Sequence, residues 1–291
     1  MLYIILLAVF TIWMFCLAKK KPLSWHAYIT AYSIGVYVAD VTEVSFNLLL
    51  GLYKFPMHLL PDPMFDNELG IIFSDTLILP IALIVFLYYA KKEHPWRTSL
   101  PFIALFIATE IIFFITGYLK YIHWSLLFSV LAYTSVFPLA AHNAPRIARY
   151  DPPIPYSIRL MCFSHTIIMW VGAAFSLPLL KMYEFRPGIF QDIMADCRFT
   201  DLLSGDILAI IITLVIPRIQ KRRKWAVFTA VACLGVAFAL FFYYSGWLIY
   251  QRWNHFFMAL RYFVPVFLIL LYDRWEFSYK AQTIRESPGK A

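Results

Sequence analysis

The residues of this chain that could do chemistry are a few polar side chains set within strongly apolar stretches. They are Asp40, Glu43, Asn47, Asp75, Glu110, Asp206 and Arg261. Carboxylates can bind a cation or a proton, and a guanidinium can bind hydrogen-bond acceptors. An ionisable group inside a bilayer costs roughly 2.5–3.5 kcal/mol on insertion scales, so each one needs a partner, a polar cavity or a function. These seven residues are therefore the candidates for binding an ion or a small solute.

Spacing groups three of the candidates and gives two others a simpler explanation. Asp40, Glu43 and Asn47 are spaced i, i+3 and i+7, which places them on one face of a helix that is not expected to look at lipid. Asp75 and Asp206 are expected near helix N-termini, where the helix macrodipole favours an acid. The structural alternative for the whole set is that its members only pair with one another or reach lipid headgroups.

Composition identifies the lipid bilayer as the solvent of this chain. Of its 291 residues, 62% are hydrophobic and only 14% are charged. A soluble fold of this length needs a more charged surface. The formal charge of +8 comes from short basic runs between apolar stretches, which indicates membrane topology and argues against nucleic-acid binding.

Nine apolar segments are long enough to cross a bilayer as helices. They lie at approximately residues 2–18, 27–50, 69–90, 99–118, 124–141, 158–181, 202–217, 225–246 and 254–272. Basic residues, among them Lys21, Lys91 and Arg222, fall on alternate connections, which predicts an N-terminus outside and a C-terminus in the cytoplasm. The external connections at 51–68 and 182–201 carry acids and are expected to be interfacial or partly re-entrant.

An internal duplication is visible at a spacing of about 130 residues. Residues 117–133 match residues 246–262 with a Gly, two Tyr and a Trp in register, and Tyr53 answers Tyr183 upstream. Membrane composition alone produces Leu and Phe coincidences, but not this combination. Asp75 roughly answers Asp206 in the same comparison.

The predicted fold is an all-α integral membrane protein with nine transmembrane helices. Its parts are a leading helix at 1–21, two parallel four-helix repeats at 22–150 and 151–280, and a cytoplasmic tail at 281–291.

The candidates are expected to meet at one level of this fold. Glu43, Asp75, Glu110, Asp206 and Arg261 each lie roughly four to eight residues, or about 6–12 Å, from the external helix ends. We expect them to line an outward-facing polar cavity between the repeats. Glu110 and Arg261 come from non-equivalent positions of the two repeats and are expected to form a buried ion pair across their interface.

Several stretches of the first repeat also carry a family resemblance. They are the Phe-x-Asp-x-x-x-x-Pro pattern of Phe73 to Pro80, the mid-helix Glu110, and the Gly, Tyr and Trp of residues 117–124. They resemble an uncharacterised family of small four- to five-helix membrane proteins of spore-forming Firmicutes. The second repeat departs from that pattern, because Ala239 stands in the place of Glu110. The resemblance implies this architecture and the cell membrane of a Gram-positive bacterium, and it implies no reaction.

Enzyme chemistry has little support in the sequence. The chain has no Gly-rich phosphate loop, no HExxH and no GxSxG, and its four cysteines lack metal-ligand spacing. A lone His165 is more often a packing residue than a proton relay. We therefore name no catalytic residue, metal site or cofactor.

The leading functional hypothesis is that the protein binds or transports a small solute, cation or proton. The alternative is a non-transporting membrane sensor, scaffold or envelope or sporulation module, which predicts a dry interface between the repeats. A third class, an intramembrane lipid-modifying enzyme, would need two acids or a His within about 3 Å near the headgroups.

Overall fold

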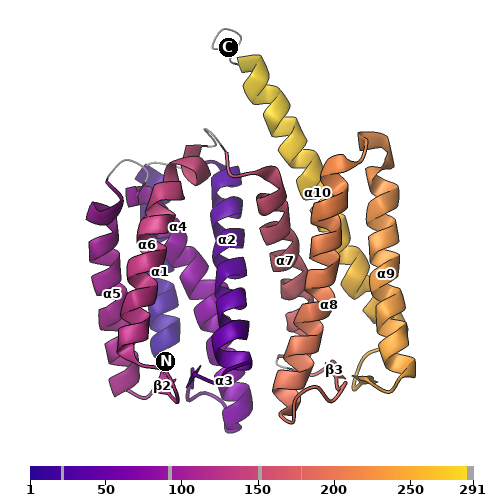
Figure 1. Ribbon diagram of the computed structural model, residues 1–291, viewed down its shortest axis with the longest axis horizontal. Helices are drawn as coiled ribbons and strands as arrows, with labels where there is room; N and C mark the ends of the chain where they lie inside the picture. The colour runs from indigo at the N-terminus through magenta and orange to yellow at the C-terminus, as the bar shows by residue number, and fades with distance from the viewer. Residues whose placement is uncertain (21–22, 91–93, 150–152, 178, 287–291) are drawn as a thin grey trace. The chain divides into compact units, whose positions relative to one another are not determined.

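The computed structural model describes residues 1–20, 23–90, 94–149, 153–177 and 179–286, which are almost entirely helical (Figure 1). The chain divides into two compact units, Met1–Pro155 and Tyr156–Ala291. Within the described residues, seven helical stretches are long and apolar enough to cross a membrane, as expected of a multi-pass membrane protein. The expected segments 27–50 and 158–181 also form helices, but they are not among these seven.

Some sequence expectations fall outside the described residues. Two of the basic residues used to predict orientation, Lys21 and Lys91, lie there, and so does the end of the tail at 287–291.

The described part of the first unit contains six α-helices, two π-helices and two short strands. In chain order they are α1 (Leu2–Lys20), α2 (Trp25–Glu43), the π-helix η1 (Val44–Leu48), β1 (Tyr53–Lys54), α3 (Pro63–Ile71), the π-helix η2 (Ile72–Ile78), α4 (Leu79–Ala90), α5 (Pro95–Ile115), β2 (Lys120–Tyr121) and α6 (Leu126–Arg149). Three rings pack the core, with Phe86 5.0 Å from Phe102 and 5.1 Å from Phe137. The leading helix α1 belongs to this unit, because Tyr3 donates a hydrogen bond to the Tyr118 carbonyl at 2.7 Å.

The second unit has the same order of elements without a leading helix. They are α7 (Tyr156–Phe175), β3 (Tyr183–Phe185), α8 (Ile193–Val215), two short 3-10 turns η3 (Ile216–Arg218) and η4 (Lys221–Arg223), α9 (Lys224–Tyr244), β4 (Leu248–Tyr250) and α10 (His255–Glu286). The apolar span expected at 254–272 lies inside α10, and this helix extends beyond it to Glu286. It continues because Asp273 and Glu276 form ion pairs within the unit, which a search for apolar stretches cannot detect.

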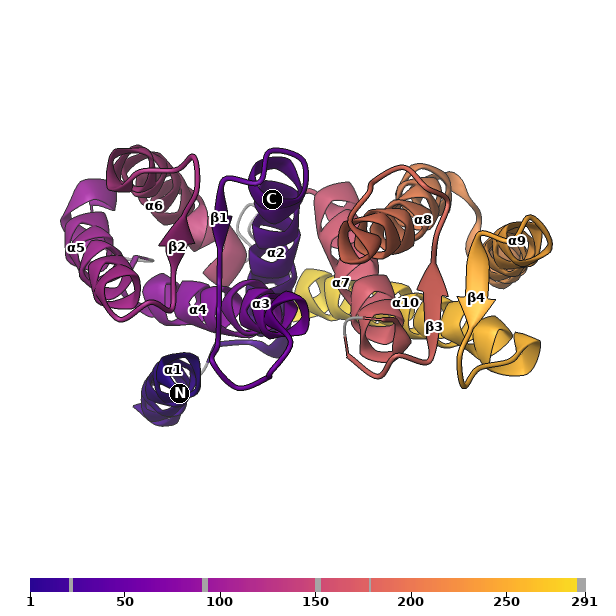
Figure 2. The same ribbon diagram turned by 90° about the horizontal axis from the view of Figure 1, so that it is seen from below.

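A two-stranded antiparallel pair crosses one end of each unit, which we call the strand end (Figure 2). In the first unit β1 pairs with β2, with Tyr53 opposite Tyr121. In the second unit β3 pairs with β4, with Tyr183 opposite Tyr250. Tyrosines therefore face each other at the same point of both pairs.

A buried aspartate fixes the loop between strand and helix in each unit. The Asp66 carboxylate accepts hydrogen bonds from four successive backbone N–H groups, those of residues 57–60, at 2.8–3.0 Å. Asp196 accepts from the N–H groups of residues 188–190 at 2.7–3.1 Å. The connections expected to be interfacial or re-entrant are thus ordered caps on the strand ends.

The helices after these loops start earlier than expected. Asp62 and Asp192 accept hydrogen bonds from the backbone N–H groups of Met64 and Met194, as N-cap residues do. The helices therefore begin at 63 and 193, where 69 and 202 were expected. Charged residues in the first two turns, among them Asp66, Glu68, Asp196 and Arg198, lowered the local hydropathy and hid these starts.

A π-helix explains why the spacing between matching residues changes along the chain. Asp66 and Asp196 are 130 positions apart, whereas the paired Tyr121 and Tyr250 are 129 apart. Each π-helical turn accommodates one extra residue, and η2 lies between these two points only in the first unit. A spacing of 131 fits neither side of it, so Asp75 and Asp206 do not occupy matching positions.

Candidate intramembrane binding sites

Glu110 lies near the strand end of the first unit, enclosed by hydroxyl groups. Its Oε1 accepts hydrogen bonds from Tyr121 at 2.5 Å and from Ser129, and its Oε2 accepts one from Tyr133 at 2.8 Å. Ser129 in turn accepts from the Trp124 indole at 2.7 Å. All partners of Glu110 are neutral, and the side chain is buried.

Other acids are also buried in the first unit. Asp40 and Glu43 are buried on α2 and Asp75 on η2, and Asn47 donates a hydrogen bond to Glu43. The expected shared face of Asp40, Glu43 and Asn47 thus brings two of the three into direct contact. In the part of the first unit that the structure describes, no lysine or arginine is buried.

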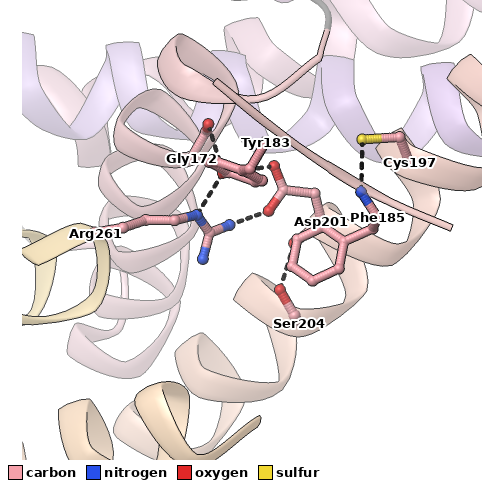
Figure 3. Close-up of polar contacts among 7 residues, drawn as sticks. All are labelled: Gly172, Tyr183, Phe185, Cys197, Asp201, Ser204 and Arg261. Carbon is pink, nitrogen blue, oxygen red and sulfur yellow. Dashed lines mark hydrogen bonds and ion pairs between the residues drawn. The ribbon is translucent and has the colours of Figure 1, made fainter. Parts of the chain in front are cut away.

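Arg261 lies at the strand end of the second unit, and its ion-pair partner is Asp201 (Figure 3). Its Nη2 donates to Asp201, and its Nε donates to the Tyr183 hydroxyl at 2.6 Å. Tyr183 lies 3.0 Å from the Gly172 carbonyl and 3.3 Å from the second Asp201 oxygen. Arg261 thus has its ion-pair partner inside its own unit, and Glu110 has hydroxyl partners inside its own, so the ion pair expected between them stays a prediction.

Sequence reasoning missed Asp201 because the seventh span was taken to begin at residue 202. In the structure α8 begins at Ile193, so Asp201 is already inside the helix and buried. Recognising Asp192 as a helix N-cap would have revealed this residue.

Asp206 has a different partner from the other acids. Its Oδ1 lies 2.6 Å from His165 Nδ1, joining the middle of α8 to the middle of α7. His165 is fully buried, while Asp206 is partly exposed. His165 is thus a buried residue with a hydrogen-bond partner, and a role in proton relay stays a prediction. The pair lies far from either helix end, whereas a lipid-modifying enzyme would need these groups near the lipid headgroups.

A further ionic cluster ties α7, α9 and α10 together at the opposite end from the strands. Lys224 bonds both oxygens of Asp273 at 2.7 and 3.0 Å, and Tyr156 donates to the same carboxylate. Arg159 pairs with Glu276. All of these groups except Arg159 lay outside the expected apolar spans, and none was predicted as a site residue.

Burial keeps the strand tyrosines protonated. It raises the pKa of Tyr183 well above the usual range, although neighbouring Arg261 opposes the shift. Burial, helped by nearby tyrosines, raises the pKa of Tyr250 to about 12. Burial and the hydrogen bond to Glu110 raise the pKa of Tyr121. These phenols are therefore hydrogen-bond donors at physiological pH.

Within each unit, the candidates have separate partners. Glu43 and Asn47 are joined, Glu110 has its own hydroxyl partners, and Asp206 and Arg261 bind different groups in the second unit. Within the described ranges, no group of three or more His, Cys, Asp or Glu side chains could hold a metal ion. No protein-family model, curated protein or solved structure matches this chain, so its functional interpretation rests on this geometry.

Proposed function

We propose that this chain is a membrane protein that binds a proton or a small monovalent cation at Glu110 and moves it across the bilayer. The observation that carries the proposal is the buried Glu110, which is 8% exposed and has three hydroxyl donors but no cationic partner among the residues that the structure describes. Hydroxyl donors hold a carboxylate in place but leave its charge uncompensated in a medium of low dielectric constant. A proton or a cation supplies that compensation.

The ligand atoms favour a small, singly charged species. Tyr121 and Tyr133 each donate one hydrogen bond to Glu110, and their oxygens keep lone pairs. The site therefore offers several oxygen ligands around one carboxylate. Divalent ions such as calcium take six to eight oxygen ligands, usually from several carboxylates. One carboxylate with hydroxyls is better matched to a proton or a monovalent ion.

The His165–Asp206 pair favours a proton, and not a metal cation, as the transported species. An imidazole exchanges protons near neutral pH, and a carboxylate bonded to one of its nitrogens orients the ring. The 2.6 Å contact lies at the middle of two long helices, where protons cannot be carried by bulk water. Glu110 and this pair would then be two proton-binding positions, one in each unit.

The proposal includes an architecture of nine spans in two parallel repeats. The common order of elements and the matching strand pairs support a tandem duplication. Basic residues on alternate connections support an external N-terminus and a cytoplasmic C-terminus. The family resemblance supports the cell membrane of a Gram-positive bacterium as its location.

One observation favours a second candidate, a non-transporting sensor, scaffold or envelope or sporulation module. Both oxygens of Glu110 already accept hydrogen bonds, as expected of a carboxylate that only joins α5, β2 and α6. A module of this kind would show no ion flux and would purify with a partner protein.

Flux through liposomes tests the proposal. The full-length protein is reconstituted with the pH dye pyranine inside, and a potassium diffusion potential drives proton entry. We expect Glu110→Gln, which keeps the side-chain shape, to lower the flux at least tenfold. The matched control is Asp62→Asn, because asparagine caps a helix as well as aspartate does.

Two outcomes would contradict the proposal. Equal fluxes in the wild type and in Glu110→Gln would remove Glu110 from the pathway. No proton flux and no uptake of radioactive sodium by the wild type would leave the non-transporting module as the function. Abundance and melting temperature are measured for each variant, so that loss of fold is not read as loss of flux.

A further inference from the structure

Three buried hydrogen-bond donors near Arg261 have no acceptor in the part of the chain that the structure describes. They are Nη1 of Arg261, the hydroxyl of Tyr262 and the indole N–H of Trp253. Arg261 and Tyr262 are 3% and 1% exposed, and the guanidinium carbon lies 4.6 Å from the centre of the Tyr262 ring. In Figure 3 the Nη1 end of Arg261 points away from Asp201. Buried donors are rarely left without an acceptor, so we expect a bound molecule to supply acceptors for these three donors.

The first unit identifies the missing acceptors. Tyr133 and Trp124, which match Tyr262 and Trp253 at the 129-residue spacing, donate to acceptors on the same unit. Tyr133 donates to the Glu110 carboxylate, and Trp124 donates to the Ser129 hydroxyl. At the positions that match these two acceptors, the second unit has Ala239 and Met258. It has therefore kept the donors, lost the acceptors and gained a guanidinium.

We infer that the second unit binds the carboxylate of an apolar acid, whose oxygens replace the acceptors that the first unit supplies from Glu110 and Ser129. Arginine presents several N–H donors in one plane and suits a carboxylate better than a single donor does. Two of its nitrogens already bind Tyr183 and Asp201, so Nη1 is the one that meets the ligand.

Two glycines fix the donors in place. A Cβ atom on Gly172 would lie 2.7 Å from Arg261 Nη2, and one on Gly235 would lie 2.4 Å from the Tyr262 ring. Both contacts are too close for any larger residue, so the helices approach Arg261 and Tyr262 closely only because these positions lack side chains. The donors are therefore held by packing before a ligand arrives.

The surroundings select an apolar acid. The Trp253 ring lies 5.0 Å from Phe175, 5.6 Å from Tyr183 and 5.3 Å from Phe257, so the body of the ligand meets aromatic side chains. Asp201 already balances Arg261, so a single carboxylate adds one uncompensated negative charge and a phosphate would add more, which makes the singly charged group the less costly ligand. A straight-chain fatty acid has the required single carboxylate and apolar body.

Photo-crosslinking of the full-length protein in phosphatidylcholine nanodiscs tests this inference. The probe is dodecanoate with a diazirine near its methyl end, and unlabelled dodecanoate, methyl dodecanoate and dodecanol compete with it. We expect saturable labelling within residues 156–286 that dodecanoate competes and the two uncharged analogues do not. Tyr262→Phe removes only the hydroxyl and should weaken competition by dodecanoate about five- to tenfold.

The matched control is Tyr244→Phe, which alters an exposed tyrosine and should change nothing. If Tyr262→Phe fails to fold, Trp253→Phe removes another of the three donors and should weaken competition in the same way. Labelling that does not saturate, equal competition by methyl dodecanoate, or an unchanged affinity in the folded variants would overturn the inference. No ion gradient enters the assay, so its result is independent of proton flux through Glu110.

Discussion

Charged side chains in the two units are stabilised in two different ways. Glu110 has only hydroxyl partners, whereas Arg261 has an ion-pair partner in Asp201. Removing one member of a buried ion pair leaves the other charge uncompensated and typically costs 3–5 kcal/mol. Removing the charge of Glu110 leaves its hydroxyl partners with a neutral acceptor. Variants of Arg261 therefore test stability, and Glu110→Gln tests function.

The aspartates that bind loop N–H groups should be essential for stability. Asp66→Asn replaces one acceptor oxygen with a donor that faces backbone N–H groups, so we expect the free energy of unfolding to fall by about 2 kcal/mol or more. Thermal unfolding followed by circular dichroism in detergent measures this. Asp62→Asn is the control and should stay within about 0.5 kcal/mol of wild type. Similar melting curves for the two variants would show that the loop does not depend on Asp66.

Gly235→Ala should destabilise the protein even though alanine is the better helix former. The substitution gains about 1 kcal/mol of helix propensity, but the new methyl group would overlap the Tyr262 ring. Overpacking of this kind costs about 1–3 kcal/mol, so the net effect should be a lower melting temperature. Cys233→Ala, at an exposed position of the same helix, should have little effect. A stabilised Gly235→Ala variant would mean that Tyr262 lies elsewhere.

At the scale of elements, the strand pairs and the π-helix set the geometry of both sites. Tyr121 on β2 reaches Glu110, and Tyr183 on β3 reaches Arg261, so each strand pair places one phenol over a buried charge. The π-helix η2 adds a residue between the loop and the rest of its helix. A π-bulge can be removed by deleting one residue without changing the helix that follows it.

Deleting a residue inside η2 should therefore be tolerated. Removal of Phe73 should convert the π-helix to an α-helix, like α8 at the same place, and leave α4 in its register. Removal of Val85 from α4 should rotate the remaining residues of that helix by about 100° about the helix axis and prevent folding. Size-exclusion profiles and melting temperatures in detergent distinguish the two. If both deletions are equally damaging, the extra residue of the first unit is not stored in η2.

At the scale of the whole molecule, composition and helix length make this a multi-pass membrane protein, and orientation remains a prediction. Gln251 follows β4 at a strand end, and Gln220 lies between η3 and η4, so α9 separates them. If α9 crosses the bilayer, they lie on opposite sides.

Cysteine labelling of intact cells tests that orientation. With the four native cysteines replaced by serine, Gln251→Cys should react with a membrane-impermeant maleimide and Gln220→Cys should react only after lysis. The reverse pattern would mean that the basic connections lie outside. Reaction of both in intact cells would mean that α9 does not cross the membrane.

Periodicity and composition determined the membrane class, most helix positions and some of the buried polar residues, such as Glu43, Glu110 and Arg261, because lipid tolerates only apolar helical stretches. The 129-residue match also indicated that Tyr121 and Tyr250 share a role before their strands were known. Local sequence could not reveal which charges meet. Arg261 and Asp201 are 60 positions apart, and Asp206 is 41 from His165, so these contacts follow from how the helices pack. Hydropathy likewise hid the capped helix starts at Asp62 and Asp192, because charged residues in the first two turns make the segment resemble a loop. Only the tertiary structure decided that Arg261 pairs with Asp201 whereas Glu110 is bound by hydroxyl groups, since pairing energies depend on distance and burial and not on residue type alone.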